Sequence, residues 1–464
     1  MSFLKNIMMN LPEVTGPSQK RLSFKEKLKW TLAILVLFFV LGLIPLFGLG
    51  KNALQQFEFL SLILGAKFGS IISLGIGPLV TASIVLQLLT GSGILKIDLT
   101  SHDGKRHFQG LQKILSIFFV IFEAAIYVFM GGLAPPASTE GLSIHLWLQL
   151  FLVFQLFIGG VLIMFMDEVV SKWGFGSGIS LFIAAGVSES IFIRAFSPLP
   201  SPTNPNVMTG AVPSLFQFLA SGDATNALLM FAAVAFTVIV FLMAVYAQAM
   251  KVEIPLSFGR IRGHGIRWPL SFIYTSNIPV ILVAALLANL QLWAMLMQNW
   301  GHPILGTFTG NTPSSGLVTW LFPSNIVAKI ITQSIRWIDV AHALVYILFM
   351  VVGAVIFSYF WVQTSGMDAR SQAKQMMASG LQIPGFRRDE RVLERLLDRY
   401  IMPLTIMGAI AVGILAALAD LSGALSNGTG ILLTVMIIYR LYEDIARQHM
   451  MDMNPMLRKF MGGS

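Results

Sequence analysis

Long apolar stretches without charge alternate with short charged segments along the whole chain. The first covers residues 30–50 and, at a rise of 1.5 Å per residue, is long enough to cross an apolar layer about 30 Å thick as a helix. Nine further stretches follow, at residues 68–95, 114–139, 141–166, 173–188, 224–250, from 268 to near 293, 340–367, 400–419 and 421–439. The pattern predicts an all-α membrane protein with ten transmembrane helices.

Basic residues gather in alternate connections between these spans. With the N-terminus placed inside, 26 of the 31 Lys and Arg residues fall in the two terminal segments and in the connections on the same side. Only Lys51, Lys67, Arg194, Lys329 and Arg336 fall on the other side. Because Lys and Arg favour the cytoplasmic side, we expect a multi-pass protein of the cell membrane with both termini cytoplasmic.

The ten spans divide into five plus five. The divide is residues 197–223, rich in Pro, Ser and Asn, which we interpret as an external hinge loop between an N-terminal half, 1–196, and a C-terminal half, 224–464. An odd number of spans in each half would make the halves inverted repeats with a pore or site between them. An undivided bundle explains the pattern equally well, since no residue-level repetition is evident.

Composition narrows the possible chemistry. Residues are 55% hydrophobic and 11% charged, whereas soluble domains carry about 25% charged residues. The chain has no cysteine, scattered histidines, no GxxxxGK[ST] phosphate loop and no HExxH. We therefore expect no cofactor, no metal and no enzymatic activity. A lipid-embedded enzyme would need a set of catalytic residues, and the sequence shows none. An inverted-repeat secondary transporter is an alternative, although Glu123 is the only acid well inside a span and ion coupling usually needs several.

Two patterns leave alternatives open. Residues 52–70 are half apolar yet too polar to cross, which fits either a half-inserted helix buried in protein or a helix on the outer surface. Ile76 with Val80, and Ile179 with Ile183, lie at i, i+4 and so share helix faces. Such pairs usually pack in a core, but a ring of bulky aliphatic side chains can also seal a pore against water and ions.

The inside connections 251–269 and 368–399 are strongly basic. Attraction to anionic lipid is one interpretation, and docking of an RNA-rich or acidic partner is another, because Arg suits phosphate. Within the second connection, the apolar residues of 385–400 have helical spacing, which predicts an amphipathic helix.

Several motifs resemble the SecY family of protein-translocation channels. They are, in order, LGIGPLVTASIVLQLL (74–89), DEVVSKWGFGSGISLFIAAGV (167–187), IPLSFGRIRG (254–263), YTSNIPVIL (274–282), FWVQTSG (360–366), GFRRDE (385–390) and GTGILLTVMIIYRLYE (428–443). Matches run from near residue 24 to near 447, across all ten spans. ANLQLW (288–293) is similar to the archaeal and eukaryotic branch.

The resemblance implies two inverted five-helix halves around a central pore. The protein would be the pore-forming subunit of the Sec translocon, a passive gated channel for secretion of unfolded polypeptides across the membrane and for lateral insertion of membrane proteins. The family's pore ring falls on Ile76, Val80, Ile179, Ile183, Ile281 and Leu433. Its plug helix, at about 57–70, includes Phe57, Glu58, Phe59, Leu60, Leu64, Gly65 and Ser70. Its lateral gate falls on Thr81, Glu123 and Asn289.

The resemblance also implies partners. Arg260, Arg262, Arg387 and Arg388 fall in the family's ribosome-docking loops. A SecE/gamma-type subunit and a small beta-type (SecG-like) subunit would complete a heterotrimer, and signal peptides, nascent polypeptides and membrane lipid would be its other contacts. Ser271 stands where relatives often carry Lys, which is expected to alter docking slightly without touching the pore.

Overall fold

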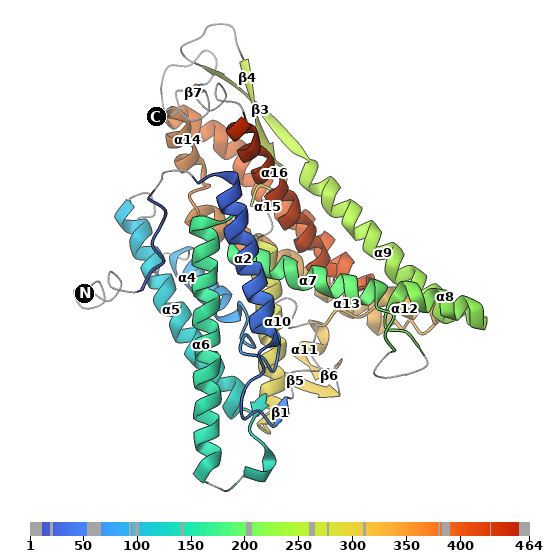
Figure 1. The fold of residues 1–464 in the computed structure, drawn as a ribbon. Coiled ribbons are helices and arrows are strands. Elements are labelled where there is room, and N and C mark those ends of the chain that lie inside the picture. Colours follow the sequence, from blue (N-terminus) through green and yellow to red (C-terminus); the bar gives the residue numbers. More distant parts are fainter. Residues whose placement is uncertain are drawn as a thin grey trace.

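In the part of the chain that the structure describes, ten long helices follow one another in the order that the hydropathy pattern predicts (Figure 1). The computed structural model describes residues 12–18, 22–52, 66–91, 94–95, 97, 102–139, 141, 143–200, 207–258, 265–275, 278–309, 312–378, 381–382, 390–426 and 428–453. The N-terminal half contributes α2 (Phe24–Leu43), α4 (Gly77–Gly91), α5 (His102–Phe129), α6 (Ser143–Trp173) and α7 (Gly178–Phe196). The C-terminal half contributes α9 (Ala224–Ala249), α10 (Ile278–Asn299), α13 (Trp337–Thr364), α15 (Glu390–Leu421) and α16 (Gly428–Met453).

The predicted start of the seventh span, at Trp268, is wrong. Residues 265–271 form strand β4 (Gly265–Ser271), which pairs antiparallel with β3 (Lys251–Phe258), and the helix begins only at Ile278. An apolar run without regular periodicity does not distinguish a strand from a helix, so absence of charge alone could not place this boundary.

Several helices extend beyond their apolar spans. α5 begins at His102, twelve residues before the predicted start, and α6 runs to Trp173. α15 joins residues 390–400 of the predicted amphipathic segment and the ninth span into one helix that contains Pro403. Helix ends that leave the apolar layer regain charged residues, so a charge-free criterion truncates them.

Short elements occupy the connections. Residues 197–223, interpreted as a hinge loop, contain helix α8 (Ala211–Ser221). The connection between α10 and α13 holds β5 (Gly306–Thr309) paired with β6 (Thr312–Gly316), then α11 (Leu317–Trp320) and α12 (Ile326–Ile331). The remaining short elements are β1 (Lys51–Asn52), β2 (Leu133–Ala134), the 3₁₀ turn η1 (Ala137–Thr139), α14 (Ala369–Ala378) and β7 (Leu381–Gln382).

These elements distinguish the two ends of the bundle. The β3–β4 hairpin, β7 and α14 lie at one end, here the hairpin end, which the basic residues predict to be cytoplasmic; β1, β5 and β6 lie at the other (Figure 1).

The two halves meet along two seams. On one side α7 packs against α16, and on the other α4 packs against α10 and α13. The buried apolar side chains between them form a cluster that draws on both halves, including Phe38, Phe182, Tyr346 and Met350. Close packing is helped by glycine: at Gly159 of α6 a Cβ would lie 1.8 Å from the carbonyl oxygen of Ile71.

Candidate functional site: an aliphatic ring beside a polar gate

The six predicted ring residues come from four segments, two in each half. Ile76 lies in the turn before α4 and Val80 in its first turn, while Ile179 and Ile183 lie on α7. Ile281 lies near the start of α10, and Leu433 lies on α16. Five of the six are buried, with at most 6% of their surface exposed, and Ile179 is half-buried. All six belong to or pack on one apolar cluster that draws on both halves.

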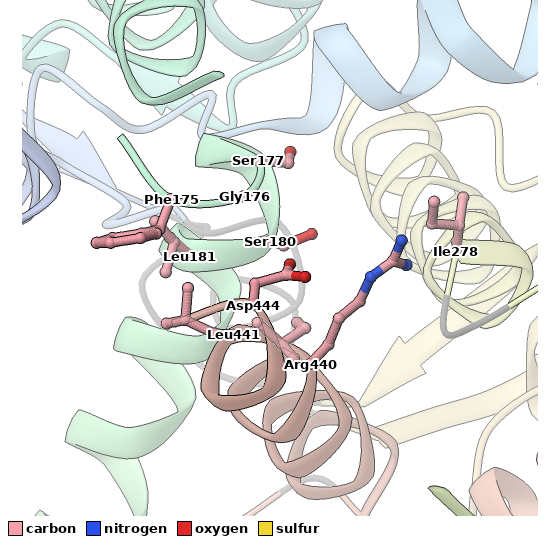
Figure 2. Close-up of a pocket in the computed structure, with 10 residues that line it drawn as sticks. Phe175, Gly176, Ser177, Ser180, Leu181, Ile278, Arg440, Leu441 and Asp444 are labelled. Atoms are coloured by element: carbon pink, nitrogen blue, oxygen red, sulfur yellow. The ribbon is translucent and has the colours of Figure 1, made fainter. Parts of the chain in front are cut away.

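A cavity of about 250 Å³ lies next to this ring, on its hairpin side. Ile278, Ile437 and Ser180 line it, and each is within four residues of a ring residue on the same helix. Figure 2 shows Arg440 reaching from α16 toward Ile278, with Asp444 beside it on the same helix. The cavity beside the ring therefore has both apolar and charged walls.

The three predicted gate residues form one hydrogen-bonded cluster. Thr81 Oγ1 of α4 donates to Glu123 Oε1 of α5 at 3.1 Å, and it can donate instead to Gly77 O at 2.9 Å. Asn289 Nδ2 of α10 donates to Thr81 Oγ1 at 3.0 Å. All three side chains are buried. The cluster thus joins two helices of the N-terminal half to one of the C-terminal half.

The gate cluster leaves buried polar atoms without a protein partner. These are Glu123 Oε2, Asn289 Oδ1, the Tyr127 hydroxyl and Trp293 Nε1. Tyr127 and Trp293 each lie four residues beyond a gate residue on their own helix, so they share its face. A buried polar group without a hydrogen-bond partner destabilises the packed state. These atoms therefore make the contact between the helices less stable than a purely apolar contact would be.

Most of the predicted plug lies outside the described residues, including Phe57, Glu58, Phe59, Leu60, Leu64 and Gly65. Its last residue, Ser70, is buried and forms an isolated antiparallel β-bridge with Pro45. The backbone here is tied to the end of α2, since Leu46 N donates to Gly69 O and Ile71 N donates to Ile44 O, each at 2.9 Å. Phe68 packs edge-on against Tyr127, with ring centroids 6.4 Å apart. The base of the predicted plug segment therefore contacts α5, the helix that carries Glu123.

The predicted docking residues Arg260, Arg262, Arg387 and Arg388 also lie outside the described residues. The strands that flank them are described, and β3 pairs with β7 through Ser257–Gln382 and Phe258–Leu381. The two basic connections thus share one small sheet at the hairpin end. Below it, Tyr274 donates its hydroxyl to Met367 O at 2.7 Å, and burial raises the pKa of this tyrosine.

Sequence reasoning missed several residues at the site. Phe360 of α13 contacts Gly91 at the end of α4. Asp167 and Asp420 accept hydrogen bonds from the first turns of α7 and α16, the two helices that carry Ile183 and Leu433. Asp167 and Phe360 lie inside the family-like motifs, but nothing in the sequence indicated their contacts. Within the described ranges, no group of three or more His, Cys, Asp or Glu residues is arranged to hold a metal ion.

Comparisons with known proteins agree on one family. The SecY family model matches residues 70–442. The protein translocase subunit SecY of Methanothermobacter thermautotrophicus is 48% identical over 97% of both chains, and that of Methanocaldococcus jannaschii is 41% identical over 99% of this chain and 100% of its own.

Two solved structures are similar over nearly the whole chain. One is described as the structure of a protein conducting channel, with a TM-score of 0.82 and 41% identity, covering 97% of this chain and 98% of that one. The other is Sec61 in the canine ribosome-channel complex from the endoplasmic reticulum, with a TM-score of 0.79 and 40% identity over 97% of each chain. This chain is therefore a member of the SecY family of protein-conducting channels.

Proposed function

We propose that this chain is the pore-forming subunit of a Sec translocon, a passive gated channel that lets unfolded polypeptides cross a membrane and lets apolar segments leave sideways into lipid. The observation that carries the proposal is the pairing of two features at the seam between the halves. Six aliphatic side chains from both halves share one apolar cluster, and a hydrogen-bonded polar cluster joins α4, α5 and α10 beside it.

The two features suit different tasks. A constriction of bulky aliphatic side chains excludes water and ions, because hydrating an apolar gap is unfavourable. Polar contacts between membrane helices average about 0.6 kcal/mol by double-mutant cycles. Bonds of that strength bias the gate toward the closed state and still yield to an arriving signal segment. The plug segment would close the pore from the outside, held at its base by the contacts of Ser70 and Phe68.

The chain would work with partners. Both termini are proposed to lie in the cytoplasm, with the hairpin end facing the ribosome, in keeping with the ribosome-bound state of the canine relative. The family resemblance adds a SecE/gamma-type subunit and a small SecG-like beta subunit in a heterotrimer, with signal peptides and nascent chains as clients. No phosphate loop occurs in the sequence, so the driving energy would come from a partner rather than from this chain.

The alternative of an inverted-repeat secondary transporter gains nothing from the comparisons. Nor does the site favour it: the polar cluster has one carboxylate, that of Glu123. A coupled transporter needs a midplane binding site that also holds its ion.

Reconstitution tests the proposal. The purified chain, combined with candidate small subunits in liposomes, is expected to translocate a signal-bearing client and to exclude the same client without its signal. In planar bilayers, replacing ring residues such as Ile183 and Leu433 with Gly is expected to raise resting ion conductance. Transport of the client with unchanged resting conductance in the ring variants would remove the ring from the mechanism. No transport with any subunit combination would contradict the function.

A further inference from the structure

The last helix of each half begins in the same way. α7 begins at Gly178 and carries the ring residue Ile183 five residues later; α16 begins at Gly428 and carries the ring residue Leu433 five residues later. At 1.5 Å per residue, each ring side chain lies about 7.5 Å from the start of its helix. α7 and α16 are the fifth helices of their halves, so a five-plus-five repeat makes them equivalent.

An aspartate from the preceding helix caps each of these helices. Ile179 N donates to Asp167 Oδ1 of α6 at 3.0 Å. Thr429 N donates to Asp420 Oδ1 of α15 at 2.7 Å. In both cases the donor follows the initial glycine. Amides in a first helical turn lack an intrahelical partner, and an acidic group there also complements the helix dipole.

Glycine allows each helix start to reach its aspartate. A Cβ on Gly178 would lie 2.6 Å from Cα of Asp167, and a Cβ on Gly428 would lie 1.9 Å from the carbonyl carbon of Ala419, the neighbour of Asp420. Side chains at these positions would push the helix starts away from the carboxylates. The cap and the glycine therefore work as a pair in each half.

The correspondence extends to the third helix of each half. Gly160 and Gly413 each lie seven residues before the aspartate of their helix. A Cβ on Gly160 would lie 2.6 Å from Val120 of α5, and a Cβ on Gly413 would lie 3.0 Å from Val351 of α13. α5 and α13 are equivalent in the repeat. Each aspartate is thus carried by a helix that is itself seated closely against its half.

We infer that Asp167 and Asp420 are equivalent positioning residues for the pore ring, each fixing the start of a ring helix and so the depth of Ile183 or Leu433. The inference rests on the proposed function, because it assumes that the ring seals the pore. The α16 cap has an additional support: Asp420 Oδ2 accepts from the Tyr346 hydroxyl of α13 at 2.6 Å. Asp167 also receives a long contact of 3.5 Å from Ser177 Oγ, in addition to its bond from Ile179 N.

The test compares resting ion conductance in planar bilayers for reconstituted complexes. Asp167→Ala and Asp420→Ala are each expected to raise it several-fold, because a helix start without its cap lets the ring residue shift. Asp167→Asn and Asp420→Asn keep an oxygen acceptor and are expected to stay near the unmodified level. The matched control is Asp223→Ala: Asp223 caps α9 by accepting from Asn226 N at 3.1 Å, and α9 carries no ring residue.

The outcomes separate the inference from the function on which it rests. Unchanged conductance in both Ala variants, or an equal rise in the Asp223→Ala control, overturns the positioning role. If the Ala variants do not assemble, Asp167→Glu and Asp420→Glu replace them; each moves the carboxylate by one methylene and is expected to give a smaller leak, and no leak overturns the role. The Ile183→Gly and Leu433→Gly variants are measured in parallel. An unchanged resting conductance in these variants overturns the ring seal itself.

Discussion

Gly91, the last residue of α4, abuts the ring of Phe360 on α13: a Cβ on Gly91 would lie 2.3 Å from Phe360 Cδ1. This contact crosses the same seam as the bond between Thr81 and Asn289. Gly91 is ten residues beyond Thr81 on α4, or about 15 Å along the helix. The seam between α4 and the C-terminal half is therefore held at two levels, by polar contacts at Thr81 and by glycine against an aromatic ring toward the hairpin end.

Enlarging residue 91 should force the seam apart. Gly91→Val overpacks the contact, which typically costs about 1–3 kcal/mol, and is expected to lower the hydrophobicity that a segment needs to exit into lipid. Phe360→Ala makes room, so the double variant is expected to return toward the unmodified threshold. The measurement is membrane insertion of a graded series of test segments. Gly186→Val is the control, since nothing lies within 4 Å of a Cβ at Gly186; additive effects of Gly91→Val and Phe360→Ala would contradict a direct contact.

The polar cluster gives a second prediction for the same assay. Glu123→Leu and Asn289→Leu are each expected to shift the insertion threshold, because each removes a bond to Thr81. The double substitution should shift it by less than the sum of the singles, since the two residues share one hydroxyl. The shift per bond is expected to be about 0.6 kcal/mol, the average for such contacts. Strict additivity would assign Glu123 a role local to its own helix.

Helix existence could be predicted from the sequence far better than helix boundaries. The sixth span, predicted at 224–250, is observed as Ala224–Ala249, because charged or polar residues bound the apolar run at both ends. The seventh was misplaced at its start, since β4 is apolar enough to resemble a helix entering the membrane. Burial of an apolar segment in lipid depends on composition, whereas strand pairing depends on a distant partner, here β3.

The candidate site shows the same limit. The aliphatic pairs could be found by spacing, but their meeting between the halves required the fold. The residue-level repeat stayed hidden because Asp167 precedes Gly178 by eleven residues while Asp420 precedes Gly428 by eight. Because the two connections differ in length, the equivalent residues of the two halves do not align in sequence, although they occupy equivalent places in the structure. Capping across helices leaves no local pattern, because the aspartate acts on a different helix from its own.

The basic connection 368–399 provides a prediction about partner binding. Arg387→Glu with Arg388→Glu is expected to weaken ribosome binding and to make it less sensitive to salt, because each lost phosphate contact removes the release of a counterion. Cosedimentation of reconstituted complexes with ribosomes over a salt series measures both quantities. Lys329→Glu, at the opposite end of the bundle, is the control. An unchanged affinity and salt slope would leave attraction to anionic lipid as the role of these arginines.

The N-terminal segment 12–18 is fastened across the hairpin end of α6. Glu13 Oε1 accepts from Lys172 Nζ at 2.5 Å, and Thr15 O accepts from Trp173 Nε1 at 2.9 Å. The hydrogen bond from Lys172 holds the pKa of Glu13 below its ordinary value of 4.5. A carboxyl group whose pKa is depressed in the fastened state favours that state at pH values above its free pKa, and the contribution is lost as the pH falls through the depressed value.

We therefore expect segment 12–18 to stay fastened at neutral pH and to loosen as the pH drops below about 4.5, the free pKa from which that of Glu13 is lowered. Because the chain has no cysteine, a spin label at Thr15→Cys reports this release directly as increased mobility. Glu13→Gln removes the charge and should loosen the segment at neutral pH, with a smaller further change on acidification, because Val14 N remains bonded to the Glu168 carboxylate. The Glu13 side chain is largely exposed, so the change should be partial and should shrink at high salt. An equal acid-induced gain in mobility with and without the Glu13→Gln substitution would show that another group fastens the segment.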